Sequence, residues 1–383
     1  MRRPLVDLTD DQARRALILK WGTVPADVLP AWVAEMDYAL DPVVQEAVQE
    51  AVRDGVTGYP AWGAEHDPLG PAYAGFAARH FDWAVAPDDV LPVVDVTAGV
   101  RLALDVLSDA GPVVFPTPGY APQFDVAALT GRERWDLPVD PGAERAELDL
   151  DRLDRLFADG ARTLLLTQPH NPWGRVFTRA ELEGVRDVVS RHGARVVSDE
   201  IHAPLVLPGA EHVPYLSVDG TADHAVAVVA ASKAFNTAGL RCAQLIVPDQ
   251  TARRAVLDAP MARNDSWSPL GVVAAVAAYE YGDPWLASLV ERLDQLRTLL
   301  GQLLTTHLPE VRMRPLEATY LAWLDARAYG YDDPAAVALE RGRVKLGAGD
   351  DYAPGLSGHA RLNIATSPAR LTRIVERLAT AWT

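Results

Sequence analysis

The segment Ala231-Ser232-Lys233-Ala234-Phe235-Asn236-Thr237-Ala238-Gly239 decides how the fold of this chain is interpreted. It follows an apolar run, residues 225–229, that consists of valine and alanine and is expected to form a buried strand. Lys233 would then lie at the carboxyl end of that strand, where burying an ammonium ion is costly unless it loses its proton or gains a partner. A Schiff base with an aldehyde removes the charge, and enzymes use lysine amines in this way. The segment therefore makes Lys233 a candidate for covalent chemistry.

Polar residues follow other short apolar runs in the same manner. The runs occupy residues 93–96, 113–115, 164–166, 195–197 and 225–229, and a further strand is expected at 242–247. Helical patterns separate them, and this alternation is typical of an α/β protein. Ligands of open α/β sheets bind at the carboxyl ends of the strands. We therefore expect one crevice to contain Thr97, Tyr120, Asn171, Asp199 and Lys233.

The ends of the chain have a different pattern from its middle. A helix with an apolar face is expected from Asp41 to about Asp54, with Asp41 as its cap. From Asp283 onward we expect a long helix over residues 284–305, a strand over 319–324 and a helix–strand–strand–helix tail. The predicted large domain is 41–284, and the predicted small α/β domain combines 1–40 with 285–383.

Composition excludes several classes of protein. The 383 residues carry a formal net charge of −16, which disfavours nucleic acid and anionic membranes as partners. No apolar run approaches the length of a membrane span, and acidic residues stand near the start, so a cytoplasmic protein is expected. The single cysteine, Cys242, cannot form an internal disulfide. The histidines lack the spacing of metal ligands, so no metal site is predicted.

Four motifs, in order, resemble those of class I/II aminotransferase-like enzymes, which use pyridoxal 5′-phosphate (PLP) and have the fold-type I architecture. They are Asn171-Pro172-Trp173-Gly174-Arg175, Ser198-Asp199-Glu200-Ile201-His202, the Lys233 segment and Ala360-Arg361-Leu362-Asn363. A narrower resemblance, to the MalY/PatB-type cystathionine β-lyases (C–S lyases), covers nearly the whole chain. It rests on Lys20-Trp21, 29–38, Gly58-Tyr59-Pro60-Ala61-Trp62, 198–202 and 318–325. The resemblance implies a large domain with a mostly parallel seven-stranded sheet and a smaller C-terminal α/β domain.

The resemblance also implies roles around the PLP ring. Lys233 holds the cofactor, Asp199 faces the pyridine nitrogen and keeps it protonated, and Asn171 donates to the phenolic oxygen. Tyr120 stacks on the ring, so Lys233, Asp199 and Tyr120 form the predicted catalytic set. Each role has a plainer alternative, such as a turn residue for Asn171 or a core residue for Tyr120. For His202 we leave open whether it hydrogen-bonds the ring or only packs.

A phosphate requires backbone donors at a helix N-terminus. We expect these from Gly99, Val100 and Arg101, with Ser232 and Arg241 beside them. Many relatives carry a serine at the position of Ala230, so one hydroxyl donor is missing here, and Arg101 or Ser232 could replace it. The resemblance implies that Tyr59 reaches the phosphate from the neighbouring subunit of a homodimer.

Arg361 is expected to bind the α-carboxylate of an amino acid substrate, because its planar fork matches a carboxylate. The backbone near Val33 and Ala34 could add a donor. The aromatic candidates for the pocket around the substrate side chain, most of them expected in the core, are Trp32, Tyr38, Trp62, Trp173 and Trp267.

The resemblance favours β-elimination on cystathionine or another L-cysteine S-conjugate, which gives a thiol, pyruvate and ammonia. The freed Lys233 amine would act as the base at Cα. Two alternatives use the same residues: an aminotransferase for a neutral or aromatic amino acid, and a specialised-pathway enzyme for a bulky cysteine S-conjugate. A sensor built on this fold would need an added DNA-binding module, for which the sequence offers no basic segment before residue 20.

Overall fold

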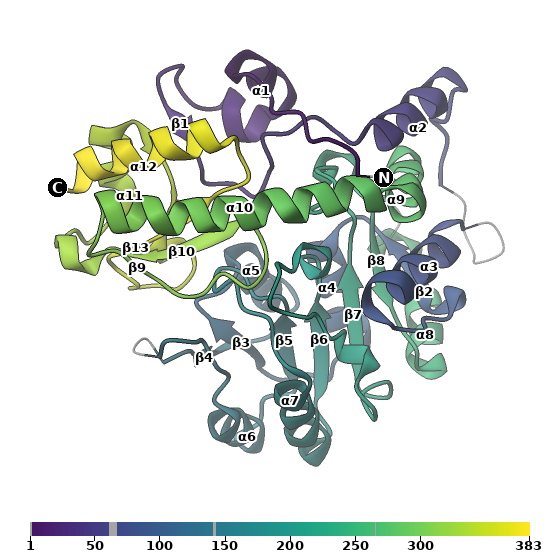
Figure 1. Cartoon of the computed structure of the whole chain (residues 1–383). Coiled ribbons are helices and arrows are strands. Elements are labelled where there is room, and N and C mark those ends of the chain that lie inside the picture. Colours follow the sequence, from purple (N-terminus) through teal and green to yellow (C-terminus); the bar gives the residue numbers. More distant parts are fainter. Residues whose placement is uncertain (1, 61–66, 141–142, 265) are drawn as a thin grey trace.

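The computed structural model describes residues 2–60, 67–140, 143–264 and 266–383. A seven-stranded sheet forms the centre of the molecule, with the strand order β2-β8-β7-β6-β5-β3-β4 (Figure 1). Its strands are β2 (Val90–Val93), β3 (Val113–Thr117), β4 (Arg134–Pro138), β5 (Thr163–Thr167), β6 (Arg195–Asp199), β7 (Ala225–Val229) and β8 (Ala243–Ile246). Within this sheet β8 runs antiparallel to both of its neighbours, and the other pairings are parallel. The predicted fold class is confirmed.

Helices cover both faces of the sheet, which explains why β3, β5 and β7 are buried along their whole length and consist mostly of apolar residues. Alternate residues of β5 show the arrangement. Leu165 belongs to a core cluster that includes residues of α4 (Val96–Leu107), α5 (Ala121–Leu129) and α8 (Gln250–Leu257). Leu164 and Leu166 point to the other face and pack with α6 (Leu150–Ala158) and α7 (Arg179–His192).

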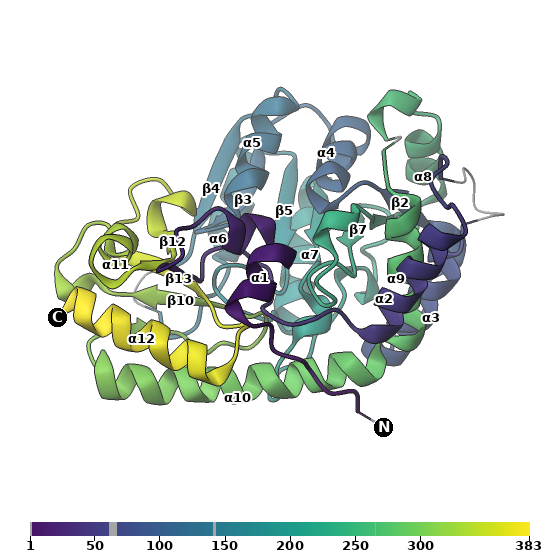
Figure 2. The same ribbon diagram turned by 90° about the horizontal axis from the view of Figure 1, so that it is seen from above.

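A second, antiparallel sheet has the order β12-β13-β10-β9. Its strands are β9 (Arg312–Met313), β10 (Leu321–Asp325), β12 (Gly347–Ala348) and β13 (His359–Asn363). The long helix α10 (Asp283–His307) packs beside α12 (Pro368–Trp382), and α11 (Pro334–Gly342) packs on α12 (Figure 2).

The N-terminal segment lies beside these C-terminal elements. The short strand β1 (Leu29–Pro30) pairs in parallel with β11 (Val344–Lys345), and α1 (Asp10–Ala16) precedes it. The helices α2 (Pro42–Arg53), α3 (Leu69–Phe81) and α9 (Pro269–Tyr281) then pack together beside the central sheet. The proposed division at residues 41 and 285 stays a prediction.

Two local expectations differ from the structure. The strand expected at 93–96 lies three residues earlier, because Asp95 ends the extended segment: its carboxylate accepts a hydrogen bond from the Ala98 amide at 2.7 Å and caps α4, which begins at Val96. The edge strand β4 is missing from the sequence-based prediction, since only Leu137 among its five residues is buried.

Within the described residues, none of the helices combines the length and apolar character that crossing a bilayer requires.

Candidate active site

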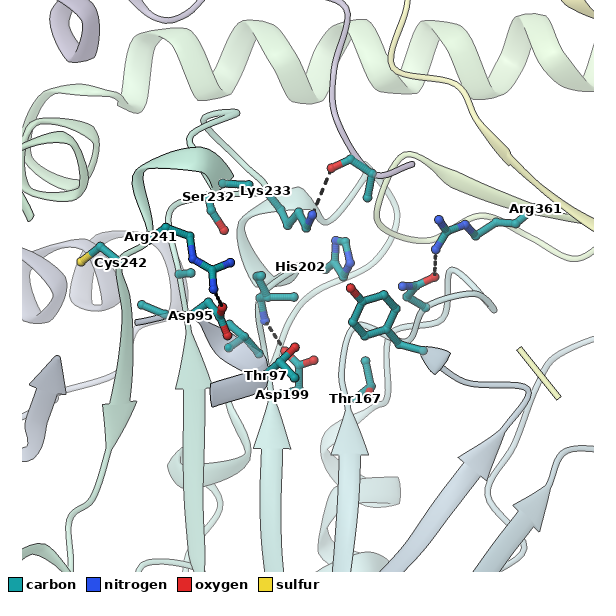
Figure 3. Close-up of a pocket in the computed structure, with 18 residues that line it drawn as sticks. Asp95, Thr97, Thr167, Asp199, His202, Ser232, Lys233, Arg241, Cys242 and Arg361 are labelled. Carbon is teal, nitrogen blue, oxygen red and sulfur yellow. Dashed lines mark hydrogen bonds and ion pairs between the residues drawn. The ribbon is translucent and has the colours of Figure 1, made fainter. Parts of the chain in front are cut away.

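A cavity of about 190 Å³, partly open to solvent, lies at the carboxyl ends of β5, β6 and β7. Figure 3 shows Arg241 and Arg361 on opposite sides of it, with Lys233, His202 and Asp199 between them. The sequence-predicted residues that line it are Ala34, Thr97, Tyr120, Asn171, Asp199, His202, Ser232, Lys233, Arg241 and Arg361. The structure thus brings most of the predicted site together.

Lys233 follows β7, and its amine donates a hydrogen bond to the carbonyl oxygen of Ala34 at 3.0 Å (Figure 3). Burial lowers the pKa of this amine to about 8, and the nearby Arg361 charge acts in the same direction. A pKa near 8 leaves part of the amine neutral at pH 7. The neutral amine is the form that attacks an aldehyde or accepts a proton.

Asp199 is the last residue of β6 and is buried. Its carboxylate accepts hydrogen bonds from the Ile201 amide at 3.1 Å and from the Gln123 side-chain amide at 2.5 Å. Burial raises its pKa to about 6, and these two donors oppose that shift. A buried carboxylate of this kind is stabilised further by a cationic partner in the cavity.

Arg361 enters the cavity from β13 and is buried. Its guanidinium donates to the Asn171 side-chain oxygen at 3.0 Å (Figure 3). The same group donates to the Trp32 carbonyl at 2.7 Å. It also lies over the ring of Tyr352, 4.7 Å from the centroid. Its Nε has no hydrogen-bond partner among the described residues. Arg361 is thus a buried cation held in place by the protein, with donor capacity left for an anion.

The backbone near Val33 and Ala34 is already engaged through its carbonyl oxygens. That of Val33 accepts from the Asn363 side chain at 2.7 Å, and that of Ala34 accepts from Lys233 and from the Tyr320 hydroxyl at 3.1 Å. Ala34 lines the cavity and Val33 does not. A donor contact from this backbone to a substrate stays a prediction.

His202 lines the cavity and is buried. Burial lowers its pKa to about 3, with Lys233 and Arg361 as further causes, so its imidazole is neutral near pH 7. Its ring meets that of Tyr320 edge-on, with 6.3 Å between centroids. Packing is therefore part of its role, and its Nδ1 has no partner in the described part of the protein.

The end of the cavity at Arg241 differs from the expectation. Because α4 begins at Val96, the expectation that Gly99, Val100 and Arg101 open this helix is wrong. None of the three lines the cavity: Gly99 packs against Val228, Val100 is buried and Arg101 is exposed. The helix start instead contributes Asp95, Val96 and Thr97.

Arg241 forms an ion pair with Asp95 at 2.5 Å, and 56% of the Arg241 side chain is exposed (Figure 3). Ser232 and Ala230 line the same end, and Arg101 does not. Of the two residues expected to replace the serine that is missing at position 230, Ser232 is therefore the one beside the cavity. Tyr59 is 96% exposed and does not line the cavity of its own chain.

The described aromatic residues that were expected near a substrate do not line the cavity. Tyr38 is buried and donates to the Thr366 carbonyl at 2.8 Å, and Trp173 stacks on His170. Of the candidates, Trp32, Tyr38, Trp173 and Trp267 do not line the cavity, and Trp62 lies outside the described residues.

Three contributors at or beside the cavity were missed by sequence reasoning: Gln123, Thr167 and Asp95. Gln123 had an available signal, because it follows Tyr120 by three residues and so shares one side of the same helix start. Thr167 is the last residue of β5 and pairs with Asp199 in the sheet register. No metal-binding cluster occurs among the described residues.

A family model described as aminotransferase class I and II matches residues 33–378. The chain belongs to this family. It is 33% identical to the cystathionine beta-lyase of Corynebacterium glutamicum, over 96% of this chain and 98% of the relative. It is 34% identical to the cystathionine beta-lyase PatB of Bacillus subtilis, over 93% and 92%. Among solved structures, cystalysin from Treponema denticola, which contains PLP, matches with a TM-score of 0.90 at 25% identity and 99% coverage of both chains.

These similarities confirm the resemblance to the MalY/PatB-type branch that the sequence motifs predict. The cavity also fits PLP by its own chemistry. It offers a lysine amine of lowered pKa and a buried carboxylate that a ring cation would stabilise. Arg241, on one side of the cavity, is available for a phosphate.

Proposed function

We propose that this protein is a PLP-dependent C–S lyase that eliminates the β-substituent of cystathionine or another L-cysteine S-conjugate, releasing a thiol, pyruvate and ammonia. The observation that carries the proposal is the arrangement of Lys233, Asp199 and Arg361 around one cavity, in a chain that matches two cystathionine beta-lyases over more than nine-tenths of its length. When bound, PLP supplies the electron sink for the electron pair left at the substrate Cα.

The charge of each residue in this site would determine its role in the reaction. Arg361 binds the substrate carboxylate and so orients the Cα–H bond. Lys233, with its lowered pKa, takes the Cα proton as a neutral amine. Asp199 remains ionised beside the ring nitrogen and stabilises its positive charge. Because the Asn171 oxygen accepts from Arg361, its amide nitrogen is left to donate to the phenolic oxygen of the cofactor.

Contacts to the other parts of the cofactor complete the proposed site. Tyr120 would stack on the ring, while Thr97, Ser232 and Arg241 would hold the phosphate. Loss of a thiolate from Cβ would distinguish this enzyme from an aminotransferase, whose substrate keeps its β-substituent and exchanges its amine for a keto group.

We propose a homodimer in which the partner's Tyr59 joins the phosphate end of the cavity. Two observations support this: Tyr59 is almost fully exposed in the single chain, and Arg241 leaves its end of the cavity open to solvent. Sedimentation of the purified protein at twice the mass of one chain would support the dimer, and a monomer that binds PLP tightly would contradict it.

The proposed location is the cytoplasm. The one cysteine, Cys242, is free, which fits a compartment where thiols stay reduced.

The test is incubation of the holoenzyme with L-cystathionine and with S-methyl-L-cysteine, while thiol, pyruvate and cofactor absorbance are followed together. We expect equal amounts of thiol and pyruvate, with the original spectrum restored at the end. Accumulation of pyridoxamine phosphate without pyruvate would overturn the lyase and favour the aminotransferase. A bulky aryl S-conjugate in a third assay tests the specialised substrate class, for which faster turnover than with cystathionine is the criterion.

A further inference from the structure

Gln123 makes the one side-chain hydrogen bond that Asp199 receives within the described residues. Its amide nitrogen lies 2.5 Å from Asp199 Oδ2, across 76 positions of sequence. Gln123 is 2% exposed and does not line the cavity, so it would touch neither cofactor nor substrate. Any influence of Gln123 on cofactor binding would therefore pass through its hydrogen bond to Asp199.

A third residue fixes the orientation of the amide. The Thr167 hydroxyl donates to the Gln123 side-chain oxygen at 3.3 Å. An ionised carboxylate only accepts hydrogen bonds, so the amide nitrogen must face Asp199 while the amide oxygen faces Thr167. Thr167 and Asp199 are also paired residues of adjacent strands. The donor is therefore held from two sides before any ligand binds.

We propose that Gln123 is a positioning residue that keeps Asp199 ionised and aimed into the cavity, toward the ring nitrogen of the cofactor. The inference rests on the proposed use of PLP, but not on which reaction follows. A hydrogen bond to a charged acceptor is stronger than one between neutral groups, and it favours the ionised form. The carboxylate has about four acceptor positions, of which the Ile201 amide and Gln123 occupy two, so room remains for a cofactor N–H.

The rival explanation is that Gln123 only fills space beneath the cavity. Two variants of similar size separate the explanations. Gln123→Leu keeps the volume and removes the donor at every pH. Gln123→Glu keeps the shape, and it can donate to Asp199 only while the two carboxyl groups share a proton.

The first measurement is the dissociation constant of PLP, taken from absorbance titrations of the apoprotein at pH 6 and pH 8.5. We expect Gln123→Leu to weaken PLP binding about tenfold at both pH values, the size expected for losing one hydrogen bond to a charged group. Gln123→Glu should bind within about threefold of wild type at pH 6, where the shared proton restores the donor. Wild-type affinity in the Leu variant would overturn the proposal.

The second measurement is the melting temperature of each apoprotein from pH 5 to pH 9, which needs neither cofactor nor activity. In folded Gln123→Glu, burial beside Asp199 raises the pKa of the introduced carboxyl group above its unfolded value, so stability present at low pH is lost as the pH rises. The melting temperature of this variant should therefore fall steeply relative to wild type toward pH 9. Gln123→Leu should show a smaller deficit that grows as the pH rises through 6 and then levels off, because loss of the donor raises the pKa of Asp199. Equal, pH-independent deficits in both variants would indicate space filling and overturn the proposal. Failure of β-elimination with intact PLP binding would instead count only against the lyase.

Discussion

Two regions of the cavity are built differently: the closed region around Asp199 and Lys233, and the open end at Arg241. In the closed region Asp199 is buried, and donors from the protein bind both of its carboxylate oxygens. At the open end Arg241 is more than half exposed and pairs with a carboxylate of its own chain, Asp95. The ion pair with Asp95 would have to rearrange before Arg241 could bind the proposed phosphate.

The largest effect is expected in the closed region. Lys233→Ala should lower the rate of pyruvate release from cystathionine by about 10³-fold or more, because it removes both the attachment point of the cofactor and the base at Cα. PLP should still bind, but reversibly, and dialysis should remove it. Retention of more than a tenth of wild-type turnover would show that another group takes the proton.

The next largest effect should come from Arg361. In Arg361→Lys the positive charge remains, but the planar fork and its bonds to Asn171 and Trp32 are lost. We expect KM for the amino acid to rise about 10- to 100-fold, as for the loss of a charged hydrogen bond, with PLP affinity changed less than threefold. Steady-state kinetics alongside PLP titration checks this. A PLP affinity that falls as much as KM rises would mean that Arg361 serves the cofactor through Asn171.

How far the sequence predicted this site depended on where each residue lies along the chain. Asp199, Asn171 and Lys233 come directly after apolar strands, and the sheet brings the ends of such strands together whatever the helices do. Gln123 lies on the helix α5, and its hydrogen bond to Asp199 joins residues 76 positions apart. Its spacing from Tyr120 is a local signal for a place near the cavity, but that spacing does not identify Asp199 as its partner. The start of α4 was misplaced because Val96 continues the apolar run in sequence, while the side chain of Asp95 turns the backbone into a helix.

Tyr59 illustrates a different limit. Its role was inferred from resemblance alone, and a single chain leaves it exposed, away from the cavity. At the open end the sequence predicted Thr97, Ser232 and Arg241, which line the cavity, while the role of Tyr59 stays a prediction. In the closed region the positions of Asp199 and Lys233 followed from strand order and burial, and Gln123 was missed.

The pH dependence of cofactor capture provides a smaller but sharper test. Only the neutral Lys233 amine attacks the aldehyde, and burial places its pKa near 8. The rate at which apoprotein captures PLP should rise about tenfold per pH unit between pH 6 and 7, then level off above pH 8. Stopped-flow absorbance measures it, with Lys233→Ala as the control that shows no capture. A rise that continues to pH 10 would mean that the amine keeps the pKa of an exposed lysine.

The smallest effect is expected at the open end, and it has the opposite sign. Asp95→Asn keeps a side chain that can cap α4, but it removes a negative charge beside the proposed phosphate position and releases Arg241 from its ion pair. PLP should therefore bind about three- to fivefold more tightly, the size expected for an exposed charge pair. The gain should shrink at high salt, where exposed charges are screened. Asp95→Ala separates charge from capping, because it releases Arg241 while also weakening the helix start. Weaker binding in Asp95→Asn would mean that the ion pair holds Arg241 in position for the phosphate instead of competing with the phosphate. The open end would then be preorganised by its own chain, as the closed region is.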